Sequence, residues 1–434
     1  MQTVTVSGTV LEFEWRCHIP SNAMNSEHEA GRTPHTMQLI YLPSALDFHH
    51  PSVQQILGKA DVLAFQRNVI TPDVHDAMRY WRALGKIVTV DLCSGDDGYD
   101  YLPPSNPAHN YWIRNKGGME IEPVEALAEG LRSADALTSP SKVLLADWEH
   151  IVPGFWIPNY PRGEWYAKAN PKPVGAKDIV FGYREIENEG VKGINFEGHF
   201  VEGTEGLIYL GWGGSISHVD SWIYSGAIEA LDKIFEKHPN VRLKFCGHET
   251  RLDYIINRWG DKVVRQSGVK PEHWPFVVST FDLGLAPLDM RPVPEEMGHG
   301  KNPKQRKYSY DERRSWLKGV EYLCAGVPWL GTRSATYNEL SRHGTIVENE
   351  NDLSQDERTA NWYKALDLAI TNIIARKTLA SEKKKWALKK WSMEANVQQY
   401  AETFERIGNV KKAKGSGSLP NIFWNRRVEA TVNA

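Results

Sequence analysis

The sequence has few cysteines and no arrangement of them that is typical of zinc binding. Only four occur in 434 residues, they lie far apart, and none forms a Cys-x-x-Cys pair. This spacing excludes the common zinc signatures. Because most of them lie in or beside apolar runs, we expect buried, reduced thiols. The four positions are Cys17, Cys93, Cys246 and Cys324.

Long apolar runs and a strong net charge are also absent. No stretch approaches the roughly 18 apolar residues of a transmembrane helix. Residues 1–10 lack the basic and apolar regions of a signal peptide. A net charge of −3 creates no overall attraction to nucleic acid or membrane. We therefore expect a cytoplasmic protein in which any attraction to a polyanion is local.

Strand-like and helical runs alternate in the first part of the chain, which is typical of an α/β protein with parallel sheets. At about 150 residues per domain, this length favours roughly two or three domains. A helix is predicted from Thr71 and Pro72, because Thr can cap a helix and Pro suits its first position. Residues 1–160 are thus predicted to form a Rossmann-like domain. Its other predicted elements are strands at 37–42, 61–66, 86–92 and 136–139 and helices at 123–134 and 141–148.

The alternating pattern stops after residue 160 and resumes near residue 206. Residues 161–205 are rich in Pro, Gly, Asn and charge, which indicates a connection or insertion. A second Rossmann-like domain is predicted over 206–390, and a helical tail over 391–434 is predicted to return to the first domain. One apolar helix face in the second domain combines Ile223, Ala227, Ile228, Leu231, Ile234 and Phe235. Further predicted elements are strands at 207–210, 242–245, 281–288 and 327–330 and a helix at 316–324.

A glycine-rich turn follows the first strand of the second domain. Its sequence is GWGGSISHVD, with Gly213, Gly214, Ser215 and His218 near the start of a helix. Ser217 and Asp220 have the spacing of a capping box, which would fix the helix start. Glycines allow close approach of a phosphate, and free N–H groups at a helix start favour an anion. The alternative is a tight turn that binds no ligand.

A carboxylate on an apolar helix marks a second candidate site. Glu321 lies beside Val320 and Leu323, in a helix that ends at Gly326 before Pro328. A carboxylate in such a place needs hydrogen-bond donors, and a ribose diol supplies two. The alternative is a pair with Lys318, one turn earlier.

These two regions resemble the GT-B glycosyltransferases, especially family 4-like members. The segments FDLGLAPL and RRSWLKGVEYLCAGVPWL resemble the C-terminal donor-binding region of those enzymes, and LGWGGSISHVDSW resembles its glycine-rich start. ADVLAFQRN and ADALTSPS resemble the N-terminal acceptor domain. The resemblance implies two Rossmann-like domains that face a cleft. It also implies retaining transfer of a sugar from a nucleoside diphosphate sugar, with no metal and no further cofactor.

The resemblance also assigns residues. Glu321 matches the second glutamate of the family's E-x7-E motif, which holds the donor ribose, whereas the first glutamate falls at Arg313. The family's Arg and Lys after the glycine-rich turn are absent, which leaves His218 as the local donor. Donor binding is thus predicted for Gly213, Gly214, Ser215, Arg313, Ser315 and Glu321, and catalysis for His218, Arg314 and Lys318.

The acceptor side is predicted at loops of the first domain. Arg16, Arg67 and Asp97 lie where acceptors dock in the family, although the two arginines are equally compatible with structural ion pairs. Asp97 belongs to an acidic turn that includes Asp91, Asp96 and Asp100. A metal-binding Asp-x-Asp is the competing interpretation. The adjacent pair Asp96-Asp97 does not have that spacing, so a solvated or acceptor-facing turn is favoured.

Two clusters of basic residues leave the acceptor open. Both are compatible with a solvated surface. The loop 301–314 also suits donor phosphates or a polyanionic acceptor such as a modified base in DNA, and the helical cluster suits anionic lipid. A protein, a lipid-linked molecule or a modified nucleic acid therefore all remain candidate acceptors. The clusters are Lys301, Lys304, Arg306, Lys307, Arg313 and Arg314, and Lys383, Lys384, Lys385, Lys389 and Lys390.

Two other functions fit the same sequence. A nucleotide-sugar epimerase shares the GT-B architecture. The missing first glutamate also fits a non-catalytic protein that binds a sugar nucleotide or a glycan.

Overall fold

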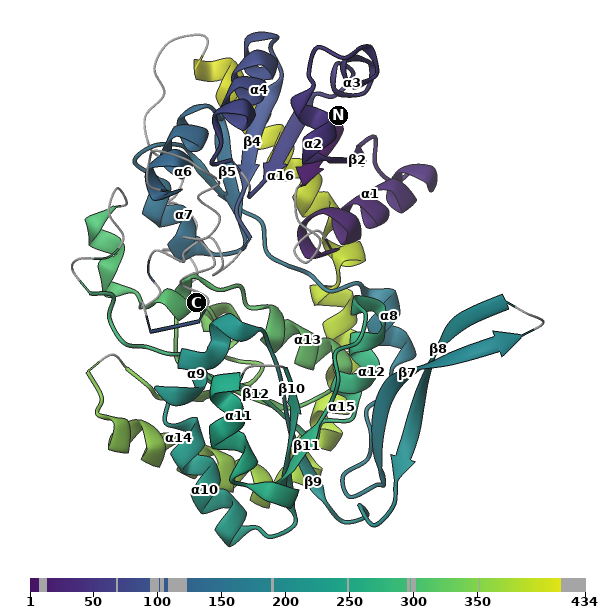
Figure 1. Ribbon diagram of the computed structural model, residues 1–434, viewed down its shortest axis with the longest axis vertical. Helices are drawn as coiled ribbons and strands as arrows, with labels where there is room; N and C mark the ends of the chain where they lie inside the picture. The colour runs from purple at the N-terminus through teal and green to yellow at the C-terminus, as the bar shows by residue number, and fades with distance from the viewer. Residues whose placement is uncertain are drawn as a thin grey trace.

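The protein consists of two parallel β-sheets of six strands each, surrounded by helices (Figure 1). The computed structural model describes residues 1–7, 14–67, 69–93, 101, 105–107, 123–188, 191–247, 250–294, 297, 302–350 and 352–414. The two sheets confirm the predicted α/β fold with two Rossmann-like halves. None of the helices in these residues is long and apolar enough to cross a membrane.

The N-terminal sheet has the strand order β2-β1-β3-β4-β5-β6, and all its strand pairs are parallel. β3 and β4 lie inside the sheet and are almost entirely buried, which explains their continuous apolar sequences. The strands are β1 (Gln2–Ser7), β2 (Thr36–Tyr41), β3 (Val62–Gln66), β4 (Ile87–Asp91), β5 (Ala136–Ser139) and β6 (Gly154–Trp156).

Six α-helices and one π-helix accompany this sheet in the described residues. The predicted helix at Thr71 is present as α4, but the Thr71 side chain makes no capping hydrogen bond. Helix α7 is capped by Ser141, whose hydroxyl accepts from the Leu144 amide. The helices are η1 (Glu14–His18), α1 (Ile19–Glu29), α2 (Leu42–Leu46), α3 (Pro51–Leu57), α4 (Pro72–Ala83), α6 (Pro123–Arg132) and α7 (Lys142–Trp148).

The segment 161–205 forms a short helix and a long β-hairpin. Helix α8 (Gly163–Lys168) packs against the C-terminal helices. Strands β7 (Asp178–Asn188) and β8 (Val191–Val201) pair antiparallel and project from the body of the protein (Figure 1). Phe196, midway along β8, stacks on the His273 ring, with ring centroids 3.8 Å apart, so the middle of the hairpin packs against the C-terminal domain.

The C-terminal sheet has the order β11-β10-β9-β12-β13-β14 and is also parallel. The single helix predicted from Ile223 to Phe235 is two helices. The chain breaks between them because Gly226 adopts a φ of 83°. The strands are β9 (Ile208–Gly213), β10 (Val241–Cys246), β11 (Val263–Arg265), β12 (Leu283–Ala286), β13 (Trp329–Thr332) and β14 (Thr345–Val347).

Among the helices of this domain, α13 carries Glu321. Helix α13 ends at Gly326, whose φ of 71° is the left-handed conformation expected of a terminating glycine. The α-helices are α9 (Val219–Ile223), α10 (Ala227–Lys237), α11 (Thr250–Asn257), α12 (Trp274–Ser279), α13 (Leu317–Ala325), α14 (Gln355–Thr371), α15 (Ile373–Trp391) and α16 (Met393–Lys414). Short 3-10 helices are η3 (Ile216–His218), η4 (Gly260–Lys262), η5 (Pro271–His273), η6 (Pro303–Lys307), η7 (Tyr310–Arg313) and η8 (Asn338–Leu340).

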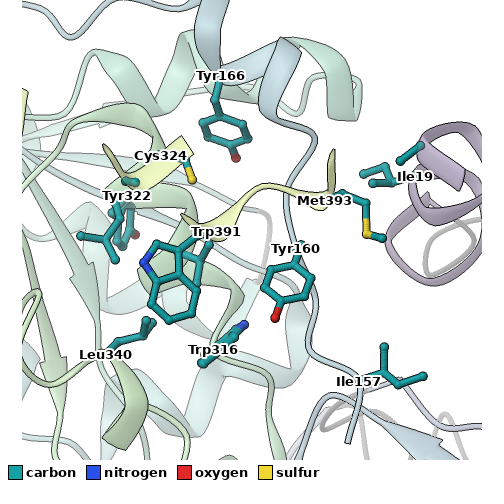
Figure 2. Packing of buried hydrophobic residues seen from close by; sticks show 14 of the residues in the cluster. Ile19, Ile157, Tyr160, Tyr166, Trp316, Tyr322, Cys324, Leu340, Trp391 and Met393 are labelled. Atoms are coloured by element: carbon teal, nitrogen blue, oxygen red, sulfur yellow. The ribbon is translucent and has the colours of Figure 1, made fainter. Parts of the chain in front are cut away.

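The C-terminal helix α16 crosses from the second sheet to the first and packs against α1 and β4 (Figure 1). One hydrophobic cluster therefore includes residues of both domains. In it Trp316 contacts Trp391 edge to face, with ring centroids 5.1 Å apart, and Ile19 and Met393 lie at the other end of the same cluster (Figure 2). All four cysteines are buried, as the sequence predicts.

Candidate functional site

A pocket of about 880 Å³ lies at the carboxyl edge of the C-terminal sheet. Open α/β sheets bind ligands outside the carboxyl ends of their strands. Trp15 belongs to the N-terminal domain, so the pocket lies where the two domains meet. The residues that line the pocket include Trp15, Gly213, Gly214, Trp274, Leu317 and Glu321.

The glycine-rich turn contributes Gly213 and Gly214 to this pocket. A Cβ atom on Gly213 would lie 2.3 Å from the Trp274 ring, and one on Gly214 would lie 2.5 Å from the Trp212 ring. Both positions therefore exclude a side chain because tryptophan rings pack against the turn. Ser215 follows at the edge, with its hydroxyl 3.2 Å from that of Ser217.

The predicted capping box at Ser217 and Asp220 is not formed. The 3-10 helix η3 intervenes, and His218 is the residue that precedes α9, without a side-chain cap. The Ser217 hydroxyl instead lies 3.3 Å from the Arg314 guanidinium. The turn is tighter than a direct strand-to-helix transition, which places the hydroxyl away from the helix amides.

A chain of hydrogen bonds links the predicted catalytic residues. Lys318 Nζ lies 3.2 Å from His218 Nε2. An ammonium group can only donate, so Nε2 accepts and Nδ1 carries the proton. Nδ1 lies 3.4 Å from the Ser221 hydroxyl, which donates to Asp311 at 2.6 Å. Burial, with Arg314 and Lys318 nearby, lowers the pKa of His218 well below its ordinary value, so the imidazole is neutral.

Arg314 belongs to the same network. It donates from Nε to Asp311 Oδ1 at 2.5 Å and from Nη2 to the Ser217 carbonyl at 2.9 Å. The guanidinium is buried and fixed to the turn after β9. The network thus brings together His218 with Arg314 and Lys318, which lie about 100 residues later in the sequence.

Glu321 lines the pocket from the first turns of α13 and is buried. Its Oε1 accepts from the Tyr166 hydroxyl at 2.9 Å, and the Trp274 side chain also donates to the carboxylate. Burial raises the pKa of Glu321 to about 7, although the hydrogen bonds and the charge of Lys318 oppose the rise. Glu321 is 6% exposed, so it is a buried carboxylate rather than one on the surface, and the charge of Lys318 acts on it as the sequence spacing suggests.

Arg313 does not line the pocket, contrary to its predicted role in donor binding. Its guanidinium forms two hydrogen bonds with Asp147 of α7, at 2.8 and 2.9 Å, and both side chains are fully buried. It also lies 3.6 Å from the centre of the Tyr101 ring. Because Asp147 and Tyr101 belong to the N-terminal domain, we assign Arg313 to the domain interface. Ser315 lies two residues before α13 and is half-buried.

The predicted acceptor-side residues have different environments. Arg16 is buried and donates to both oxygens of Asp91, with Nε at 2.8 Å, which makes it a structural residue. Asp91 is correspondingly buried rather than part of a solvated turn. Arg67 ends β3 with a φ of 60°, a strained conformation for a residue with a side chain. Asp97, like Asp96 and Asp100, lies outside the described residues.

The first basic cluster is smaller than the sequence suggests. Arg313 and Arg314 are buried in ion pairs, and Lys301 lies outside the described residues. The cations Lys304, Arg306 and Lys307 remain on η6, which packs against α7. In the second cluster, Lys384 donates to the Ala169 carbonyl, and Lys383, Lys385, Lys389 and Lys390 are exposed. Within the described residues, no three His, Cys, Asp or Glu side chains gather to hold a metal ion.

Comparison with known proteins reveals similarity only at the level of structure. No protein family model and no curated sequence matches this chain. A sucrose-phosphate synthase from Thermosynechococcus elongatus has a TM-score of 0.56 at 10% identity, covering 94% of this chain and 99% of that one. A glycosyltransferase from Rickettsia africae has a TM-score of 0.52 at 10% identity, covering 94% and 98%. The chain has the GT-B fold.

A further GT-B neighbour contains a nucleotide sugar. Anabaena HepE in complex with UDP-glucose has a TM-score of 0.52 at 13% identity, covering 94% of this chain and all of that one. The structural similarity shows a common fold. At sequence identities this low it does not show which ligand this chain binds.

Most of the residues around the pocket were not predicted, and three of these bear on Glu321 or on the domain boundary. Tyr166 and Trp274 hydrogen-bond to Glu321, and Trp15 lines the pocket from the other domain. Trp274 had one signal, since the sequence contains sixteen tryptophans and such residues often line carbohydrate sites. Tyr166 lies in a segment without periodic pattern, so the sequence offers no signal for it.

Proposed function

We propose that the protein is a glycosyltransferase that moves a sugar from a nucleoside diphosphate sugar to an acceptor. The C-terminal domain binds the donor, and the N-terminal domain faces the acceptor. The GT-B fold supports the proposal, as do neighbours that were crystallised with UDP and UDP-glucose. A uridine nucleotide is therefore the first donor to test.

The observation that carries the proposal is the position of Glu321. Glu321 lines the pocket from the helix whose N-terminus, at Leu317, also lines it. An ionised carboxylate accepts the two hydroxyls of a ribose, and a helix N-terminus favours a phosphate. One element thus presents an acceptor for the ribose and amides for the diphosphate.

The positive groups nearby suit the chemistry of the leaving group. Transfer releases a nucleoside diphosphate, whose developing charge requires fixed positive groups or dipoles. Lys318, on the first turn of α13, and Arg314 are held by the network through His218 and Asp311. We infer that they stabilise the diphosphate, which takes the proton of the acceptor hydroxyl as the sugar transfers with retention.

Product analysis distinguishes this function from its alternatives. A transferase releases nucleoside diphosphate only when an acceptor is present, an epimerase changes the sugar of the donor, and a binding protein does neither. The binding alternative is retained because Arg313, at the position of the first glutamate, lies in the domain interface. Candidate acceptors are a protein, a lipid-linked molecule and a modified nucleic acid, and each needs its own assay.

Metal independence is a separate prediction of this mechanism. Because Lys318, Arg314 and the α13 N-terminus supply the positive charge, excess EDTA should leave product formation unchanged. The measurement is the initial rate with and without EDTA, followed by addition of Mg²⁺ or Mn²⁺. Loss of activity in EDTA that either metal restores would contradict the mechanism and point to the acidic residues near Asp97.

A further inference from the structure

Glu321 is held by a residue from outside its own domain. The hydroxyl of Tyr166 donates to Glu321 Oε1 at 2.9 Å, and both side chains are buried. Tyr166 lies on α8, in the segment that joins the two sheets, and α8 packs against α12, α13 and α15. Its ring belongs to the same hydrophobic cluster as Cys324 of α13 (Figure 2).

The geometry assigns Tyr166 as a positioning residue whose hydroxyl favours the ionised form of the Glu321 carboxylate and orients it for the ribose of the donor. A tyrosine hydroxyl that donates to Oε1 restrains the plane of the carboxylate. An ionised carboxylate has about four lone-pair sites, so the bonds from Tyr166 and Trp274 leave acceptor sites for a ligand. This role rests on the proposed function, because it needs a ligand with hydroxyl groups in the pocket.

The groups around Glu321 show why the hydrogen bond from Tyr166 affects the ionisation of its carboxylate. Lys318 on the same helix and the side chains of Tyr166 and Trp274 favour the ionised carboxylate. Burial opposes ionisation, and the other titratable groups that face Glu321 are neutral at pH 7, because burial raises the pKa of each above its ordinary value. They are Tyr322, Cys324 and Tyr337. Without the Tyr166 hydroxyl, only Lys318 and Trp274 oppose the effect of burial, so the pKa of Glu321 should rise.

The test is the pH dependence of UDP-glucose binding by the full-length protein, measured by isothermal titration from about pH 6 to about pH 9. The variant is Tyr166→Phe. The control is Tyr160→Phe, which removes the hydroxyl of a tyrosine six residues earlier in the chain. That hydroxyl donates to Gln399 at 2.7 Å and not to Glu321. We expect wild type and control to gain affinity as pH rises through about 7, where Glu321 ionises. In Tyr166→Phe the midpoint should rise by about one pH unit, so that affinity falls about fivefold at pH 7 and about tenfold at pH 6, and recovers at high pH.

A loss of affinity in Tyr166→Phe that is the same at every pH, or no loss, overturns the assignment. Failure of the wild type to bind UDP-glucose instead counts against the proposed donor. A second measurement then tests Tyr166 without a ligand: infrared titration of the protonated carboxyl band that Glu321→Gln removes. The assignment requires a higher midpoint in Tyr166→Phe than in wild type, and equal midpoints overturn it.

Discussion

Glu321 combines two requirements that oppose each other. Ribose binding needs an ionised carboxylate, whereas its burial removes it from water. The rise of its pKa from 4.5 to about 7 corresponds to a cost of about 3 kcal/mol when it is ionised. The residue therefore lowers stability in the state in which it is proposed to work.

Glu321→Gln should consequently stabilise the protein more at high pH than at low pH. Between pH 4.5 and about 7 the folded state binds more protons at Glu321 than the unfolded state. The free energy of unfolding of the wild type therefore falls as pH rises through this window. The measurement is urea unfolding of both proteins at about pH 5 and about pH 8, with a difference of up to about 3 kcal/mol in the effect of the substitution. Equal effects at the two pH values would contradict the buried position of this carboxylate.

Individual site residues were predictable only where their own sequence context was unusual. Glu321 could be singled out because it is a charge on an apolar helix. Arg313 was assigned to the donor, and the choice for Arg16 between acceptor binding and a structural ion pair stayed open, because their partners, Asp147 and Asp91, lie far away in the sequence. A buried ion pair and a binding residue look alike until the partner is known.

At the scale of elements, the buried parallel strands could be predicted and the irregular ones could not. β3 and β4 have continuous apolar runs because both faces of the sheet are covered. The hairpin β7–β8 mixes glycine, charge and aromatic residues, since it is a two-stranded arm with much of its surface in water (Figure 1). β1, although central, alternates threonine with valine and was not predicted.

The break between α9 and α10 shows how tertiary contacts override periodicity. The apolar positions continue across it with helical spacing, which predicts one helix. Gly226 instead adopts a φ of 83°, and a Cβ atom there would lie 2.5 Å from the Thr359 amide nitrogen. The close approach of α14 therefore determines where the helix begins, and that contact cannot be deduced from local sequence.

At the scale of the whole molecule, the two domains are joined by polar as well as apolar contacts. The sequence predicts two Rossmann-like halves because the alternating pattern occurs twice. Their relative placement depends on distant pairs such as Arg313 with Asp147, and on α16 packing against α1. Because Trp15 lines the pocket from the N-terminal domain, this placement also shapes the site.

Arg313→Leu should therefore destabilise the protein strongly. Removal of one member of a buried ion pair leaves the other charge uncompensated, which costs about 3–5 kcal/mol. The control is Arg333→Leu, whose pair with Glu348 is about half exposed, so a loss of less than about 1 kcal/mol is expected. The measurement is the midpoint of urea unfolding for the two variants. Similar midpoints would contradict the role of Arg313 in the domain interface.

The central claim is that the pocket beside Glu321 binds a nucleoside diphosphate sugar. The most direct measurement is the thermal unfolding of wild type and Glu321→Ala with a panel of nucleotide sugars, beginning with UDP-glucose. A donor at about 100 times its Kd should stabilise the wild type by about 2.7 kcal/mol. At the same concentration it should stabilise Glu321→Ala much less, since loss of a hydrogen-bonding charge costs about 1.5–3 kcal/mol. Stabilisation of neither protein by any nucleotide sugar, or equal stabilisation of both, would contradict the claim.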